Sequence, residues 1–306
     1  MKAIQVYFDW NIFAYYRDYL LKKSNTFNRQ FEQLELLFSD NNIETYYSDA
    51  HIIDLLPIIK TNMQNDFYKN DLSAISKLTN NKYLQFDYYR NYWGFIRLPP
   101  EEQMHYLKST YFDTMDYDEQ FDLMGPIGDS LKMLFKAIPS PIPDNVDYKP
   151  ENNNSLYDVM DFLISENNDV IKDSKKFRSR KKDFFEDMIS DNEVKKIKSD
   201  LDKGNIAEFT NYYNKLSAIV GNVLNNRFSE MHFIFNLLDQ FYYASDKKLR
   251  NINIDSQHAT YASHSKTKYF ISEDNNLRKK AMIAYKILDI SLQCLSLNEF
   301  IEIFMT

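Results

Sequence analysis

The sequence predicts an α/β fold: a three-layer αβα sandwich with a central, mainly parallel sheet and a large helical insertion. An apolar run opens the chain, strand-like and helical segments alternate at both ends, and the long middle segment has mainly helical periodicity. Alternating strands and helices favour a parallel sheet that is covered on both faces. We therefore expect residues 1–60 and 230–306 to form one discontinuous core and residues 61–229 to form the insertion.

The first sixty residues predict the order strand, helix, helix, strand, helix. The short apolar runs are rich in β-formers, and the longer segments place apolar residues at helical spacing. Ser48 stands at an N-cap position, and Pro57 should kink or end the helix that follows it. The elements expected here are strands over 3–8 and 43–47 and helices over 12–23, 28–38 and 49–59.

The insertion and the C-terminal segment supply the remaining expected elements. In the insertion we expect helices over 101–120, 128–138, 155–165, 180–201 and 205–226. After it we expect helices over 231–245, 255–264, 276–285 and 297–304 and strands over 269–271 and 287–292. Periodicity is the basis of each of these assignments.

Composition excludes several classes of protein. The chain has only five glycines and no glycine-rich phosphate-binding motif. Its single cysteine, Cys294, excludes an internal disulfide and a cysteine-based zinc site. No apolar run approaches the roughly 20 residues that span a bilayer. Because the N-terminus begins with a strand-like run and lacks the features of a signal peptide, we expect a soluble, cytoplasmic protein with no membrane contact.

Four aspartates lie where a cation site can form. Asp9 and Asp274 each follow an expected strand. Asp255 opens an expected helix, and Asp54 lies on the helix after Ser48. The carboxyl ends of parallel strands meet at one edge of a sheet, so Asp9 and Asp274 should be neighbours. Clustered carboxylates repel one another, and a bound Mg²⁺ or Mn²⁺ relieves the repulsion and can activate water against a phosphodiester.

These acids resemble the site of the PIN-domain family of metal-dependent ribonucleases. The resemblance implies that Asp9, Asp255 and Asp274 bind Mg²⁺ or Mn²⁺ and that a second acid completes the cluster. That acid is Asp54, where the family usually has Glu, or its rival Asp49. The resemblance covers residues 1–60 and 230–306, and the residues that carry it are Asp9-x-Asn11, Ser48 with Asp54, Asp255 with Ala259 and Ala262, and Ile271-Ser272-Glu273-Asp274 before Leu277.

Two histidines and several polar residues are expected to support the acids. His51 and His258 each lie three residues from a candidate acid on a helix, so both imidazoles can face the site. There they can bind phosphate, donate to the leaving oxygen or act as general bases. The alternative is a surface or helix-capping histidine. The other residues expected beside the ligands are Asn11, Ser48, Asp49 and Ser272. The resemblance implies that Asn11 orients the first acid or binds a metal-bound water.

Simpler roles remain open for several of these residues. Asp9, Asp255 and Asp274 each also suit a plain helix N-cap, which aspartate favours. The net charge of −7 does not indicate nucleic-acid binding, although a carboxylate cluster neutralised by metal contributes to that charge. One concentrated basic run is a candidate for RNA contact, with a solvated helix face as the alternative; its central residues are Lys176, Arg178, Arg180 and Lys181.

The function that follows is a Mg²⁺- or Mn²⁺-dependent endoribonuclease. The substrate is RNA by resemblance, either single-stranded or tRNA, with DNA as the other candidate. A bacterial toxin-type or phage-defence setting, with a regulatory protein partner or a homo-oligomer, is an expectation by analogy. One alternative is a haloacid dehalogenase-like phosphatase, although that class has Asp-x-Asp where this chain has Asp9-x-Asn11. The other is a catalytically inactive PIN-like scaffold or binding subunit.

Overall fold

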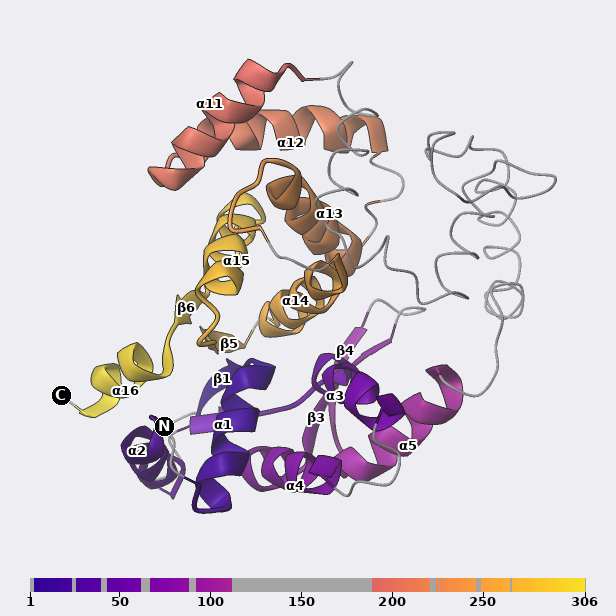
Figure 1. Cartoon of the computed structure of the whole chain (residues 1–306), viewed down its shortest axis with the longest axis vertical. Coiled ribbons are helices and arrows are strands. Elements are labelled where there is room, and N and C mark those ends of the chain that lie inside the picture. Colours follow the sequence, from indigo (N-terminus) through magenta and orange to yellow (C-terminus); the bar gives the residue numbers. More distant parts are fainter. Residues whose placement is uncertain are drawn as a thin grey trace.

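The chain is built on a four-stranded parallel sheet. The computed structural model describes residues 3–23, 26–39, 43–61, 67–87, 92–111, 189–220, 224, 226–245, 249–264 and 266–305. The strand order is β2-β1-β5-β6, so that the two ends of the chain share one sheet (Figure 1). The prediction of a mixed α/β fold with a mainly parallel sheet is therefore confirmed. The strands are β1 (Ile4–Phe8), β2 (Ile43–Thr45), β5 (Thr267–Ile271) and β6 (Gln293–Leu295).

Helices cover both faces of this sheet because alternate strand residues point to opposite sides. Val6 and Phe8 pack with α1, α2, α4 and α16, whereas Tyr7 and Phe270 pack with α13, α14 and α15. This arrangement is compatible with an αβα sandwich. The described helices are α1 (Trp10–Leu20), α2 (Asn28–Ser39), α3 (Asp49–Thr61), α4 (Phe67–Thr79), α5 (Pro100–Tyr111), α11 (Asp191–Asp202), α12 (Ala207–Val220), α13 (Arg227–Gln240), α14 (Leu249–Ala262), α15 (Asn275–Ile287) and α16 (Leu297–Met305).

Strands β3 (Lys82–Asp87) and β4 (Tyr92–Arg97) form an antiparallel hairpin inside the segment predicted to be helical. The prediction is wrong there because aromatic residues favour strands and pair across them. Phe86 and Trp93 lie opposite each other, with ring centroids 4.6 Å apart. The N–H of Tyr47 donates to the carbonyl of Lys82, which joins β3 to the chain just after β2. The hairpin is thus continuous with the core.

Two boundaries near the C-terminus also differ from prediction. Helix α14 begins at Leu249, so Asp255 lies inside it and cannot be its N-cap. Buried Ile252 and Ile254 extend the core-facing part of this helix back by a turn. The last strand is Gln293–Leu295 rather than residues 287–292, because α15 continues to Ile287 and Asp289 then takes a left-handed conformation with φ 51°.

The remaining helix predictions fall into two groups. Helices α5, α11 and α12 account for parts of the helices predicted over 101–120, 180–201 and 205–226. The helices predicted over 128–138 and 155–165 lie outside the described residues. Helix α3 runs to Thr61, past Pro57, so the proline does not end it.

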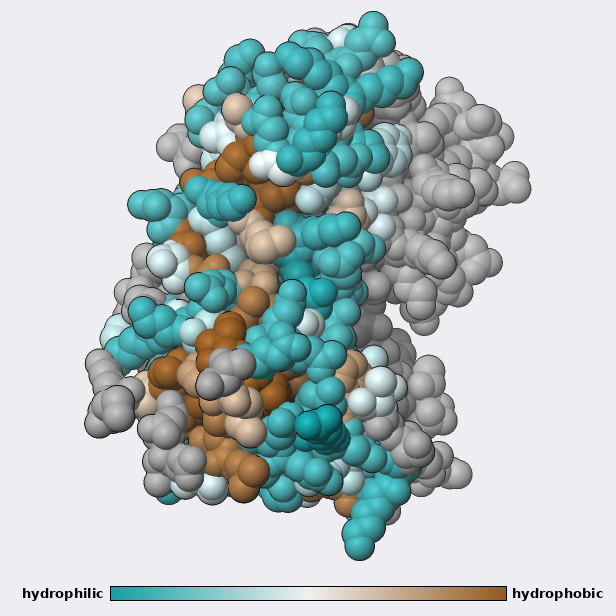
Figure 2. Space-filling model, turned by 90° about the vertical axis from the view of Figure 1, so that its left-hand side faces the viewer, coloured by the Kyte–Doolittle hydropathy of each residue, from teal (hydrophilic) through white to brown (hydrophobic). Residues whose placement is uncertain are grey.

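Exposed apolar side chains occur on amphipathic helices. The face that carries α2 and α16 shows apolar patches among mainly hydrophilic residues (Figure 2). Leu36 on α2 and Met305 on α16 are 61% and 47% exposed, whereas Phe300 of α16 is fully buried. In the described part of the chain, every helix is too short or too polar to cross a membrane.

His264 lies among aromatic side chains, 5.0 Å from Phe95 between ring centroids. Its Nδ1 is buried and has no hydrogen-bond partner among the described residues. Burial, with smaller contributions from Lys266 and Lys82, lowers the pKa of His264 to about 4. The unfolded chain, with a histidine pKa of about 6.5, therefore binds more protons than the folded chain between these two values.

Neutral His264 stabilises the fold fully above about pH 6.5, and this stabilisation is lost as the pH falls toward about 4. We predict that, when the pH is lowered from about 7 to about 5, the free energy of unfolding falls less in the His264→Phe variant than in the natural chain. Urea unfolding followed by circular dichroism measures both values, with His105→Ala on the exposed side of α5 as control. An identical pH dependence in His264→Phe and the natural chain would contradict this assignment.

Candidate carboxylate–histidine site

Asp9 lies at the carboxyl end of β1, where the chain turns into α1. It is the N-cap of that helix, because its Oδ1 accepts a hydrogen bond of 2.8 Å from the N–H of Trp10. Its other oxygen, Oδ2, accepts from the hydroxyl of Ser272 at 2.8 Å and from the amide of Asn11. The N-cap role that the sequence left open for Asp9 is therefore present, and the carboxylate is held by donors on both oxygens.

Asn11 and Ser272 tie the ends of β1 and β5 together around Asp9. The Asn11 amide also donates to Ser272 Oγ at 3.1 Å, and its carbonyl accepts from the N–H of Glu273 at 3.1 Å. Ser272 Oγ in turn accepts from the N–H of Asp274 at 3.0 Å. The structure thus places both residues beside the first acid, where the sequence expected them.

His258 brings together acids from opposite ends of the chain. Its Nε2 lies 2.9 Å from Asp54 Oδ2 and 3.7 Å from Asp9 Oδ1. Its Nδ1 lies 2.9 Å from the hydroxyl of Tyr7. The histidine side chain is 1% exposed, against 7% for Asp9 and 19% for Asp54. The result is a largely buried acid–imidazole–acid unit that joins β1, α3 and α14.

Burial and neighbouring charges shift the pKa values of the side chains in this unit. Burial lowers the pKa of His258, but the hydrogen bond to Asp54 and the charges of Asp9 and Asp54 outweigh burial and leave that pKa raised. Burial raises the pKa of Asp9, opposed by His258 and Ser272. When the imidazole is protonated, it donates from Nε2 to Asp54 and from Nδ1 to Tyr7. Because burial also raises the pKa of Tyr7, its hydroxyl keeps its proton and can donate it to Ser48, 2.8 Å away.

His51 is buried, and both of its ring nitrogens bond to backbone groups. The N–H of Ser48 donates to its Nδ1 at 3.0 Å, so the ring proton must be on Nε2, which donates to the carbonyl of Phe8 at 2.7 Å. Burial and the nearby charge of His258 lower the pKa of His51 and keep it neutral. Its contacts fix the start of α3 to the end of β1, which is a structural role.

Asp255 pairs with a residue that the sequence reading missed. Lys280 on α15 is fully buried, with Nζ 3.3 Å from Asp255 Oδ2 and 5.4 Å from the centre of the Phe235 ring. A buried ammonium needs such a counter-charge. The signal in the sequence was the position of Lys280, three residues after Leu277 and four before Ala284, on the apolar face of its helix.

Tyr7 was also missed as a member of the site. It lies between Val6 and Phe8 in an apolar strand and is fully buried, so its sequence context indicates only core packing. Its hydroxyl is nevertheless the point where Ser48 and His258 meet, at 2.8 Å and 2.9 Å. The only indication of this role in the sequence was the tyrosine hydroxyl, which needs a hydrogen-bond partner when it is buried.

Asp274 and Asp49 occupy positions outside the acid–imidazole–acid unit. Asp274 is exposed and caps α15, with its Oδ1 accepting from the N–H groups of Asn276 and Leu277 at 2.7 Å and 3.1 Å. Asp49 is a buried anchor whose carboxylate accepts hydrogen bonds from three donors in the hairpin, α5 and α14. These donors are Tyr83 at 2.7 Å, Gln103 at 2.6 Å and Tyr261 at 3.2 Å.

The carboxylate oxygens of Asp9, Asp54 and Asp255 are of the chemical type that a hard divalent cation prefers. Their present partners are other groups: Asp54 contacts His258, and Asp255 contacts Lys280. In the described part of the chain, no three His, Cys, Asp or Glu side chains form a group that could hold a metal ion. The carboxylates are therefore suitable ligands for a divalent cation. In their described positions, however, His258 and Lys280 lie among them.

The basic residues expected to contact RNA, Lys176, Arg178, Arg180 and Lys181, lie outside the described residues. Comparisons with protein-family models, curated proteins and solved structures find no match for this chain. Its function must therefore be argued from the geometry of the site.

We predict that His51→Ala lowers the free energy of unfolding by about 2–4 kcal/mol, because it leaves a cavity and two unpaired buried backbone groups. Chemical denaturation of the purified variant measures the change. His105→Ala, which truncates an exposed histidine, serves as control and should shift stability by less than about 0.5 kcal/mol. Equal free energies of unfolding of the two variants would show that the contacts of His51 do not stabilise the fold.

Proposed function

We propose that this chain is a Mg²⁺- or Mn²⁺-dependent ribonuclease with a PIN-like core. The observation that carries the proposal is the contact of His258 with Asp54 and Asp9, which gathers acids from distant segments at the carboxyl edge of a parallel sheet. Ligands bind at this edge in open α/β sheets. Asp255 adds a further charge next to His258.

The acids are proposed to hold the ion. Asp9, Asp54 and Asp255 would bind it, with Asp274 nearby after β5. A bound Mg²⁺ or Mn²⁺ supplies an activated water and neutralises charge on a phosphodiester. Asn11 and Ser272 keep the Asp9 carboxylate in one orientation through their hydrogen bonds. Such fixed ligands reduce the cost of arranging the site during reaction.

His258 and Lys280 are proposed to manage protons and charge. His258 carries a proton on Nε2 that Asp54 and Asp9 stabilise, and this proton is available for a leaving oxygen. Tyr7 fixes the ring through Nδ1. Lys280 lies against Asp255 and can turn its ammonium group toward phosphate when that carboxylate binds an ion.

RNA as the substrate, rather than DNA, rests on the resemblance to PIN-domain ribonucleases. The same analogy supports a toxin-type or phage-defence setting, a cytoplasmic location and a regulatory partner or homo-oligomer. The phosphatase alternative has less support, because that class has Asp-x-Asp where this chain has Asp9-x-Asn11. An inactive scaffold predicts the same fold without divalent-ion binding.

We predict that the purified chain cleaves single-stranded RNA when Mn²⁺ or Mg²⁺ is present and that Asp54→Asn lowers the cleavage rate by about 100-fold or more. Asparagine keeps an acceptor for His258 but removes the charge that a cation needs. Gel electrophoresis of end-labelled RNA measures the rate, and a DNA of the same sequence tests the preference for RNA.

The matched control is Asp202→Asn, which alters an exposed aspartate paired with Lys198 on α11. It should cleave at the rate of the natural chain, and circular dichroism should show that both variants are folded. The proposal fails if the natural chain leaves RNA intact with either ion, or if Asp54→Asn and Asp202→Asn cleave equally fast.

A further inference from the structure

A cavity lies along the β2 edge of the sheet. Strand β2 pairs with β1 on one side only, and all three of its residues, Ile43 to Thr45, line a cavity of about 850 Å³. The ends of α2 and α4 and the hairpin strand β4 form its other walls. None of the residues of the carboxylate–histidine site lines it. Its volume is in the range of sites for small molecules, roughly 300–1,000 Å³.

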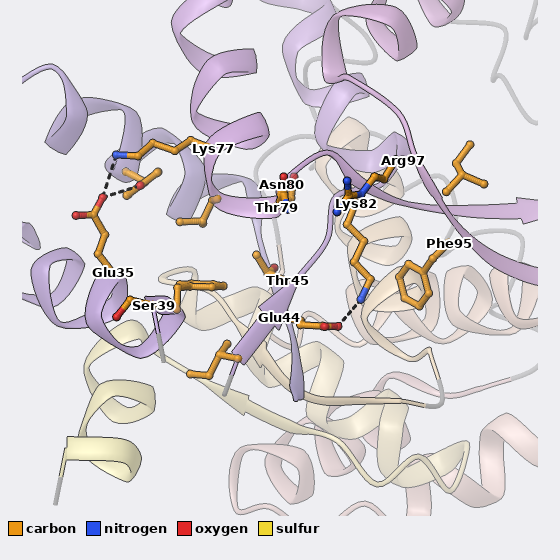
Figure 3. Close-up of a pocket in the computed structure, with 15 residues that line it drawn as sticks. Glu35, Ser39, Glu44, Thr45, Lys77, Thr79, Asn80, Lys82, Phe95 and Arg97 are labelled. Atoms are coloured by element: carbon orange, nitrogen blue, oxygen red, sulfur yellow. Dashed lines mark hydrogen bonds and ion pairs between the residues drawn. The ribbon is translucent and has the colours of Figure 1, made fainter. Parts of the chain in front are cut away.

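Thr45 is a buried polar residue in the lining of this cavity. The residue is 3% exposed, and its Oγ1 has no hydrogen-bond partner among the described residues. A buried hydroxyl without a partner is costly, and a ligand that hydrogen-bonds to it removes that cost. Thr45 lies in the middle of the cavity together with Thr79 and Asn80 (Figure 3).

Among the described residues, one cation in the wall of this cavity has no acid as its partner. Lys77 pairs with Glu35 at 3.1 Å at one end, and Lys82 pairs with Glu44 at 2.5 Å toward the other (Figure 3). Arg97 lines the same cavity and forms no ion pair with a described residue. A guanidinium is well suited to bidentate contact with phosphate. The lining therefore carries one excess positive charge, at Arg97.

An aromatic surface lies beside this cation. Phe95 on β4 lines the cavity two residues before Arg97, and its ring has Lys82 Nζ 4.6 Å from the centroid. Lys82 Nζ thus lies over this ring, and a planar base that displaces it can stack on the same face. Phe38 at the end of α2 adds further apolar lining.

We propose that this cavity binds a nucleoside monophosphate, with the phosphate at Arg97, the base against Phe95 and a nucleoside hydroxyl or ring nitrogen at Thr45. The excess charge, the aromatic surface and the unpartnered hydroxyl each match one part of such a ligand. The proposal is independent of the ribonuclease activity, because the two sites share no residue.

Isothermal titration calorimetry of the full chain with adenosine monophosphate tests this assignment. The titration contains EDTA, so that divalent ions do not bring the nucleotide to the acidic site. We expect saturable binding that Arg97→Gln weakens about tenfold and Thr45→Val weakens several-fold, since each removes one contact. Arg97 is exposed, so Arg97→Gln should fold even if Thr45→Val does not.

Three controls make the result specific. Lys198→Gln, which removes an exposed cation on α11, should bind the nucleotide as the natural chain does. Adenosine alone and inorganic phosphate alone should each bind more weakly than the monophosphate. The assignment is overturned if the monophosphate does not bind, if Arg97→Gln binds it unchanged, or if phosphate alone binds equally well.

Discussion

The hydrogen bond between His258 and Asp54 is the contact on which the rest of the site depends. It joins α14, near the end of the chain, to α3, near its beginning, and it lies next to Asp9 at the end of the central strand. Tyr7 contacts His258 and Ser48 and so extends this hydrogen-bond network to the start of α3. Without the imidazole, the carboxylates at this point would be buried with no opposite charge beside them, which is strongly destabilising.

The balance of charge around this contact explains why the chain can hold several acids together. His258 lies against Asp9 and Asp54, and Lys280 lies against Asp255, so each of these acids has a basic side chain beside it. A divalent cation at the same acids would take over the compensation. Under the proposed function, the imidazole and the ammonium would then be available for the substrate. Burial and charge compensation thus connect the stability of the site with its chemistry.

Local signals allowed the sheet and the first acid to be predicted from the sequence. The apolar runs at β1 and β5 mark strands, and Asp9 follows the first of them. The packing of α3 against α14, which is a non-local property, decides which acids lie close together. As a result, Asp54 lies near Asp9 at His258, whereas Asp274 is an exposed helix cap. Tyr7 and Lys280 were not predicted to be site residues. Tyr7 lies in an apolar strand, which indicates core packing, and Lys280 lies on a helix whose sequence looks polar.

Binding of Mn²⁺ to the full chain at neutral pH is the most direct test of the carboxylate site. Calorimetric titration should show saturable binding to the natural chain and at least tenfold weaker binding to Asp54→Asn, because one ligand charge is lost. Asp202→Asn, changed at an exposed aspartate of α11, should bind the ion normally. A folded natural chain that takes up no Mn²⁺, or an Asp54→Asn variant that binds it equally well, would contradict the assignment.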